Sequence, residues 1–258
     1  NFNLETQDVV FVSEKDYKNF SIKDFKKKLE EKTKTDILKE AKEVKEFLLT
    51  KLFGQEMAIN SVYDSLKNNI SNDGKKPKQI YFFLGPPGVG KTYLAELMSK
   101  IIKGYTKYKT FDMGQFQNEN DGIQLYGTAR GYNNMKVGVL TSFVKENPKS
   151  IIIFDEFEKA NIVIQNSLLP IFSAGYLKDT CGWNPNGRPY SNSNSCEENE
   201  IIDIVDFSQT IVIITSNLGG ELYSDNKFLE LLKTDLELAE DMIIDTLKRE
   251  KRVNSRVY

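Results

Sequence analysis

The chain has 258 residues, with 35 Lys and Arg against 37 Asp and Glu, 2 Cys and no His. This length fits one or two globular domains, and the lack of His excludes a Ser-His-Asp triad, a Cys-His pair and imidazole ligands for zinc. A net charge of −2 argues against a strongly basic nucleic-acid binder. Two cysteines cannot build a disulfide framework, which favours a reducing, cytoplasmic location.

The first residues and the lengths of the apolar runs further restrict the class of protein. No apolar run approaches the ~18 residues of a membrane helix, so we expect no membrane contact. The first ten residues lack the basic-then-apolar order of a signal peptide, and there is no initiator Met. We therefore expect the chain to begin inside a longer protein.

The first 50 residues are predicted to be a helical or linker region. Residues 21–51 are rich in Lys and Glu, and their apolar residues recur at three- and four-residue steps, as one helix face requires: Ile37, Ala41, Val44 and Leu48. A second amphipathic helix is expected over residues 55–70. Asn72, Asp73, Gly74 and Pro77 then end the helical pattern.

Four short apolar runs follow, at residues 80–84, 110–113, 151–155 and 211–215. Helical patterns or turns separate them, which is typical of parallel strands buried on both faces in an α/β fold. Residues 181–199 are full of Asn, Ser, Gly and Pro and predict an exposed loop or hairpin insertion.

The first of these runs is followed by a glycine-rich motif. It reads Gly85-Pro86-Pro87-Gly88-Val89-Gly90-Lys91-Thr92, with the spacing G-x-x-x-x-G-K-T, and a helical stripe follows. Glycines let the backbone wrap closely around a phosphate, and amides at a helix start point at the anion. Lys91 is expected to reach the β- and γ-phosphates of a nucleotide, and the Thr92 hydroxyl to bind Mg²⁺.

The third and fourth runs end in polar residues that the same sheet edge would bring near this loop. Asp155 is expected to hold Mg²⁺, and Glu156 to orient or deprotonate an attacking water. Asn217 is expected to contact that water or the γ-phosphate. Its alternative role is to cap the turn before Gly219 and Gly220.

Taken together, these motifs resemble the AAA+ ATPases, and the residues between them resemble the second ATPase module of the Clp/Hsp100 unfoldases. The resemblance runs from about Leu52 to Gly219. Its shorter matches are Gly54-Gln55, Leu125-Tyr126-Gly127, Gly131-Tyr132, residues 155–160, Leu168-Leu169, residues 175–179 and residues 215–219.

The resemblance implies a P-loop AAA+ large subdomain over residues 51–258, with a central parallel β-sheet sandwiched by helices and an N-terminal helical extension. It implies ATP or ADP and Mg²⁺ as ligands, and a ring, usually a homo-hexamer, that threads a polypeptide substrate through its pore. Leu52 and Phe53 would contact adenine; the alternative is that they pack at a helix start.

Three further expectations rest on this resemblance. Gly131 and Tyr132 stand where the family grips its substrate, although Tyr132 could instead pack on a loop surface. The insertion, about residues 180–200, stands at the second pore loop, or is a tolerated surface insertion. Arg256 is the nearest fit to an arginine that completes a neighbour's site, with Arg249 and Arg252 as competitors.

Other patterns narrow the function. No Ile-Gly-Leu or Ile-Gly-Phe loop lies between Leu218 and Arg256, so we expect no peptidase partner. The alternative to a threading unfoldase or disaggregase is a nucleotide-gated module that assembles a partner complex. A DNA motor is disfavoured because such motors need a cationic track.

The resemblance also sets an expectation for the C-terminal end. The family adds a fifth strand and a small helical lid after its arginine, and we expect this chain to lack that lid. On this view the isolated chain would hydrolyse ATP poorly.

Overall fold

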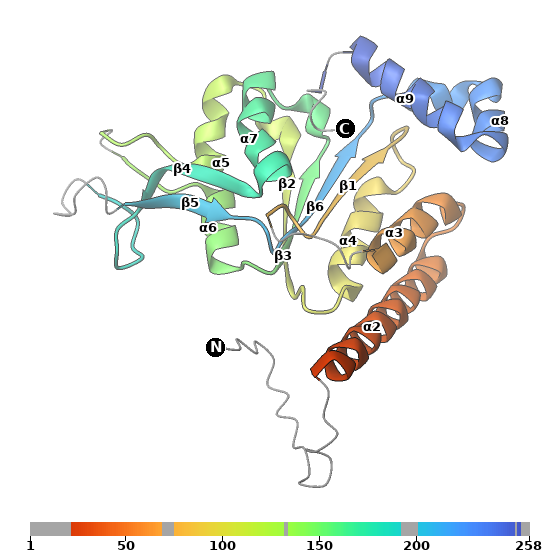
Figure 1. The fold of residues 1–258 in the computed structure, drawn as a ribbon. Helices are drawn as coiled ribbons and strands as arrows, with labels where there is room; N and C mark the ends of the chain where they lie inside the picture. Colours follow the sequence, from red (N-terminus) through yellow and green to blue (C-terminus); the bar gives the residue numbers. More distant parts are fainter. Residues whose placement is uncertain (1–21, 69–74, 132–133, 192–200, 251, 254–258) are drawn as a thin grey trace, which may run out of the picture.

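The computed structural model describes residues 22–68, 75–131, 134–191, 201–250 and 252–253, and these form helices around a parallel sheet (Figure 1). The α-helices and strands are α2 (Ile22–Lys51), α3 (Glu56–Asn68), β1 (Gln79–Leu84), α4 (Lys91–Ile101), β2 (Lys107–Asp112), α5 (Ile123–Tyr126), α6 (Val139–Glu146), β3 (Ser150–Asp155), α7 (Ile162–Ala174), β4 (Tyr176–Trp183), β5 (Ile202–Asp206), β6 (Ile211–Ser216), α8 (Asn226–Thr234) and α9 (Leu236–Glu250). Short 3₁₀ turns are η2 (Met113–Gln115), η3 (Glu119–Gly122), η4 (Phe157–Lys159) and η6 (Gly220–Ser224).

The four apolar runs form one parallel sheet in the order β1-β6-β3-β2. This confirms the predicted α/β class with its central parallel sheet. The prediction that every strand is buried on both faces is wrong for β2. That strand pairs with β3 at one edge of the sheet, and most of its residues are exposed or half-buried.

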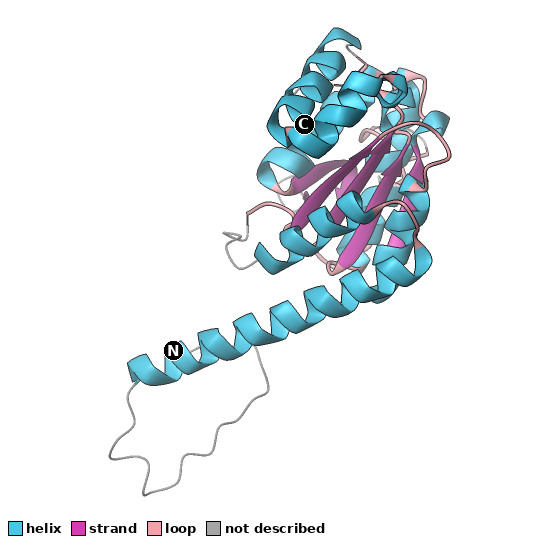
Figure 2. Ribbon diagram, turned by 90° about the vertical axis from the view of Figure 1, so that its right-hand side faces the viewer, coloured by secondary structure: helices cyan, strands magenta, loops and turns pink. Residues whose placement is uncertain are grey.

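Both faces of the two central strands, β6 and β3, are buried. Since alternate side chains point to opposite sides of a sheet, each strand contributes to two apolar clusters. One cluster takes Ile151, Ile153, Ile211 and Ile213, together with buried residues of α2, α3 and α4. The opposite cluster takes Ile152, Phe154, Val212 and Ile214, together with residues of α5, α6 and α7. The sheet is thus sandwiched between two helical layers (Figure 2).

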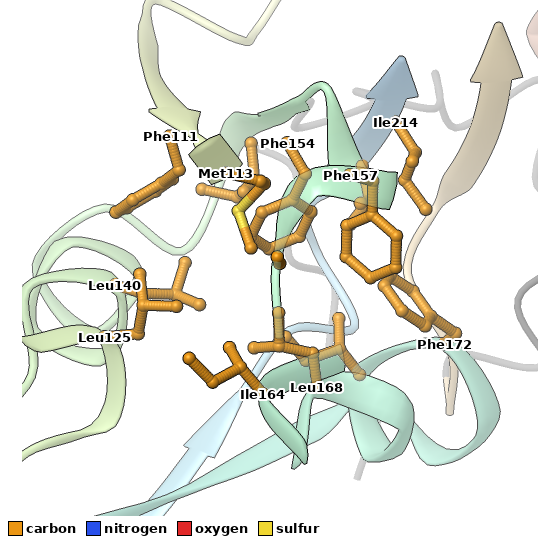
Figure 3. Close-up of a cluster of buried hydrophobic side chains, with 14 of the residues drawn as sticks. Phe111, Met113, Leu125, Leu140, Phe154, Phe157, Ile164, Leu168, Phe172 and Ile214 are labelled. Atoms are coloured by element: carbon orange, nitrogen blue, oxygen red, sulfur yellow. The ribbon is translucent and has the colours of Figure 1, made fainter. Parts of the chain in front are cut away.

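The second cluster is built around Phe154 (Figure 3). Its ring lies edge-on to those of Phe157 and Phe172, at centroid distances of 6.0 and 6.4 Å. Leu168 and Ile214 also belong to this cluster and are fully buried. Because Phe157 follows directly after β3 and its carboxylates, this packing fixes the polar end of the strand.

The N-terminal helix shares the core of the sheet. Its predicted stripe is confirmed from Ala41 onward, since Ala41, Val44 and Leu48 are buried, while Ile37 is half-buried. Val44 and Leu48 pack with Leu94 and Met98 of α4 in the first cluster. The helix also extends well beyond the sheet (Figure 2). No helix in the described part of the chain combines the length and apolar character needed to cross a membrane.

Residues 176–206 contain an antiparallel hairpin of β4 and β5. The hairpin alternative for the insertion is therefore confirmed, but the expectation of an exposed loop is wrong for its first residues. Cys181 and Trp183 belong to β4 and are buried, with exposures of 0% and 4%. Their strand was not predicted because a glycine and polar residues interrupt its apolar pattern. Residues 192–200 lie outside the described residues.

Asp179 joins this hairpin to the segment that follows α5. Its side chain is fully buried, and it accepts hydrogen bonds from the amides of Gly138, Cys181 and Gly182 at 2.7, 3.0 and 2.7 Å. It also accepts one from the Thr141 hydroxyl. A buried carboxylate is tolerated only when donors surround it in this way.

We predict that Asp179→Asn destabilises the fold. The amide has one acceptor oxygen where the carboxylate has two, so it opposes a donor to at least one of these groups. We expect the free energy of unfolding to fall by about 1–3 kcal/mol, measured by chemical denaturation. The matched variant is Asp241→Asn at an exposed position of α9, which should change it by no more than about 0.5 kcal/mol. Equal effects of the two substitutions would contradict the role given to Asp179.

Candidate nucleotide-binding site

The glycine-rich motif lies between β1 and α4, at the carboxyl edge of the sheet. Gly85, Gly88 and Gly90 have φ angles of 142°, 81° and 94°, which are favourable for glycine but not for residues with a Cβ atom. A Cβ atom on Gly85 would lie 3.8 Å from the Tyr223 ring, and one on Gly220 would lie 3.1 Å from Pro86 Cα. The turn η6 therefore packs against this loop.

Lys91, at the start of α4, connects the loop to the end of β6. Its Nζ donates hydrogen bonds to the carbonyls of Gly85 and Pro86 at 2.7 and 2.8 Å, and to Asn217 Oδ1 at 2.9 Å. Burial lowers the pKa of the Lys91 ammonium from its ordinary value, and the carboxylates of Glu158, Asp155 and Glu156 oppose that shift. The ammonium is thus partly desolvated, which strengthens its attraction for an anion.

The two carboxylates at the end of β3, Asp155 and Glu156, lie near this contact. Asn217 Nδ2 donates to Glu156 Oε1 at 3.2 Å, so the Asn217 amide bridges Lys91 and Glu156. Lys159 Nζ pairs with the other Glu156 oxygen, Oε2, at 2.6 Å, and this hydrogen bond raises the pKa of Lys159. Both oxygens of the Glu156 carboxylate therefore have defined partners.

Asp155 lies beside Thr92. The Thr92 hydroxyl donates to Asp155 Oδ1 at 2.7 Å, and the Thr215 hydroxyl donates to the same oxygen. Thr215 also accepts the backbone amide of Glu156 at 3.0 Å. A hydroxyl and a carboxylate held this close are hard oxygen ligands of the kind that Mg²⁺ prefers.

A magnesium ion fits this donor set. Groups of three or more His, Cys, Asp or Glu that could hold a metal are absent from the described residues. Mg²⁺ does not need such a group, because it keeps several waters and shares phosphate oxygens while binding one or two protein oxygens. Thr92 and Asp155 are the residues that would hold it.

A cavity of about 330 Å³ opens between these groups. It is lined by Pro87, Gly88, Gly90, Lys91, Thr92, Tyr93, Asp155, Glu156, Thr215 and Asn217. Sequence motifs separated by up to 126 residues, the distance from Lys91 to Asn217, thus meet in one place. The cavity contains the glycine, cationic, carboxylate and amide groups that a bound triphosphate requires.

The two residues expected near adenine, Leu52 and Phe53, differ in their solvent exposure. Leu52 is buried, with 7% exposure, and its Cδ2 would lie 3.6 Å from a Cβ atom on Gly90. Phe53 is 86% exposed. Leu52 therefore lies next to the glycine-rich loop, whereas the Phe53 side chain extends into solvent.

The residues expected at a pore and at a neighbour's site are only partly described. Gly131 has a φ of 96° and open space around its Cα. Before it, Arg130 pairs with Asp203 of β5 at 2.8 Å and donates to the Cys181 carbonyl at 3.0 Å. Tyr132 and Arg256 lie outside the described residues.

Sequence reasoning missed three contributors to the site. The segments that resemble the family include Thr215, Glu158 and Lys159, but the sequence alone assigns these residues no role. Thr215 positions Asp155, Lys159 pairs with Glu156, and Glu158 accepts the backbone amide of Asn217 at 3.1 Å. The available signal is their place in the sequence, within three residues of Glu156 or within two of Asn217.

Comparisons with known proteins agree with this geometry. The model of the AAA domain (Cdc48 subfamily) matches residues 76–254. The chaperone protein ClpB of Prochlorococcus marinus is 32% identical over 207 residues, which are 78% of this chain and 21% of the relative.

Two other relatives show similar coverage. ClpB of Mycoplasma genitalium is 31% identical over 88% of this chain and 27% of its own length. The ATP-dependent Clp protease ATP-binding subunit ClpC of Staphylococcus aureus is 33% identical over 69% of this chain and 20% of its own length. The chain thus spans about a fifth to a quarter of these relatives, and it belongs to the AAA domain family as an AAA+ ATPase module related to the ClpB and ClpC proteins.

Proposed function

We propose that this module binds Mg·ATP in the cavity at the sheet edge and hydrolyses it to ADP and phosphate. The observation that carries the proposal is the continuous set of contacts from Lys91 through Asn217 to Glu156. These contacts support the proposal because an ammonium that could bind phosphate, an amide and a carboxylate that could act as a base line one cavity. Gly85 to Gly90 would surround the phosphates with backbone amides.

In the proposed reaction, a water oxygen attacks the γ-phosphorus and the bond to the β-phosphate oxygen breaks. Glu156 takes the water proton, and Asn217 orients the water or the γ-phosphate. Lys91 neutralises charge on the β- and γ-phosphates. Bound by Thr92 and Asp155, Mg²⁺ would neutralise further phosphate charge. An arginine of a neighbouring copy, with Arg256 as the candidate, would complete the site.

We further propose that ATP turnover drives the remodelling of polypeptide substrates by a homo-hexameric ring in the cytoplasm. The two ClpB relatives are named chaperone proteins, which supports this use of the module. Tyr132 would contact the substrate, because a large aromatic side chain next to a flexible glycine can stack on many sequences. Residues 51–258 would form the ATPase part, and residues 1–50 a helical extension.

The second candidate is a nucleotide-gated module that assembles a partner complex. The Lys159–Glu156 ion pair favours it, because this pair occupies the proposed base and would have to loosen before catalysis. Slow hydrolysis suits a switch better than a motor. Neither a peptidase nor a nucleic acid is a proposed partner.

Glu156→Gln tests the proposed hydrolysis. The amide keeps the shape of the side chain but cannot take a proton, so kcat should fall by at least about 100-fold, while the dissociation constant for ATP should change little. Phosphate release and equilibrium binding in the full-length protein measure the two quantities. The control is Glu146→Gln at the exposed end of α6, and hydrolysis by Glu156→Gln at the rate of this control would refute the assignment.

Tyr132→Ala separates the motor from the switch. A threading motor should lose at least about tenfold in the rate of substrate unfolding, because a stacking contact has been removed, and should keep its ATP turnover. Unfolding of a fluorescent protein substrate is measured alongside phosphate release. Tyr108→Ala, at an exposed position of β2, is the matched control. Equal unfolding by both variants would favour the switch.

A further inference from the structure

The backbone of Asn217 needs a hydrogen-bond acceptor that the sheet does not provide. The last pair between β6 and β1 is Ser216 with Leu84, so Asn217 lies just beyond the ladder. Beyond the ladder, side chains accept the hydrogen bonds of the backbone amides. The amide of Leu218 donates to Ser216 Oγ at 3.2 Å, and that of Gly219 to Glu250 at 3.2 Å.

Glu158 is the acceptor for Asn217 itself. Its Oε1 accepts the Asn217 amide at 3.1 Å. Its Oε2 is buried and has no hydrogen-bond partner among the described residues. Leaving a buried carboxylate oxygen in this state costs free energy, which is unexpected for a residue with only a structural role.

The turn after β3 is what brings Glu158 to this position. Glu156 has a φ of 54° and is the one residue other than glycine with positive φ in the described part of the chain. Such a backbone conformation is strained for a residue with a Cβ atom and tends to occur at functional sites. It is stabilised here by buried Phe157 and by the hydrogen bond from the Glu156 amide to Thr215. As a result, Glu156 contacts the side chain of Asn217 while Glu158 contacts its backbone.

We propose that Glu158 is the positioning residue for Asn217, holding its backbone amide so that its side chain bridges Lys91 and Glu156. The proposal rests on the ATPase function proposed above. Glu158 does not contact the reacting atoms and acts through Asn217. Consistent with this place, Glu158 is the foremost of the three carboxylates that oppose the lowering of the Lys91 pKa by burial.

Two substitutions of similar size separate the hydrogen bond from the charge. Glu158→Gln keeps an acceptor oxygen at the same reach but removes the charge, and Glu158→Asp keeps the charge but shortens the reach. If Glu158 positions Asn217, the Asp variant should lose about 10- to 100-fold in kcat with the dissociation constant for ATP within about threefold, and the Gln variant should keep kcat within about threefold. A larger loss of kcat in the Gln variant than in the Asp variant would overturn the proposal, because it would assign the effect to charge. Equal kcat values in the two variants would also overturn it.

Hydrogen exchange at the Asn217 amide tests the same contact without any ATP turnover. Exchange should be at least about tenfold faster in Glu158→Asp than in the unsubstituted chain and nearly unchanged in Glu158→Gln. Equal rates in all three proteins would overturn the proposal. If the unsubstituted protein fails to hydrolyse ATP while the exchange pattern holds, only the proposed function is contradicted.

Glu250→Ala serves as the control for a purely structural role. It removes the acceptor of the Gly219 amide, two residues further along the same loop. We expect it to lower the melting temperature with kcat within about threefold of the unsubstituted protein. A fall in kcat as large as that of Glu158→Asp would overturn the special role of Glu158, because loosening the loop anywhere would then suffice.

Discussion

The parallel pairing of β1, β6 and β3 is the constraint on which the site depends. Because parallel strands share a direction, their carboxyl ends meet at one edge of the sheet, and the register pairs Leu84 with Ser216 and Phe154 with Ile214. A glycine-rich loop follows β1, two carboxylates lie at the end of β3, and the Asn217 amide follows β6. Burial of both sheet faces fixes this register, since a slip of one residue would exchange the two apolar clusters.

The hydrogen bonds at this edge hold the polar ends of the strands together. Lys91 is half-buried and holds two carbonyls of its own loop as well as Asn217. A phosphate could replace these neutral acceptors with charged ones, which form stronger hydrogen bonds. In the proposed function, the contacts of Lys91 would hold its ammonium beside the loop at which the phosphates would bind.

Much of this arrangement could be predicted from the sequence, because the motifs combine local spacing with strand ends. The four strands of the parallel sheet, the glycine-rich loop and the meeting of Lys91, Asp155, Glu156 and Asn217 follow from apolar runs and the G-x-x-x-x-G-K-T spacing. Glu158 could not be assigned in this way. Its contact depends on the positive φ at Glu156, and no residue pattern marks a non-glycine residue for that conformation. The exposure of Phe53 could not be predicted for a related reason, since an apolar residue beside a helix start can point either way.

The hairpin of β4 and β5 illustrates the same limit at longer range. Arg130 and Asp203 are 73 residues apart, and Asp179 and Gly138 are 41 apart, so neither contact has a spacing that sequence reasoning can detect. Both contacts connect the segment between Gly127 and Gly138 to the hairpin, and Asp179 does so without solvent access. Lys178 also contacts Asp203, at 3.1 Å, but it is 62% exposed, and exposed ion pairs contribute little. The connection therefore depends on Asp179 and Arg130, together with the Thr180 hydroxyl, which donates to the Gly127 carbonyl, so movement of the hairpin would carry the described ends of that segment with it.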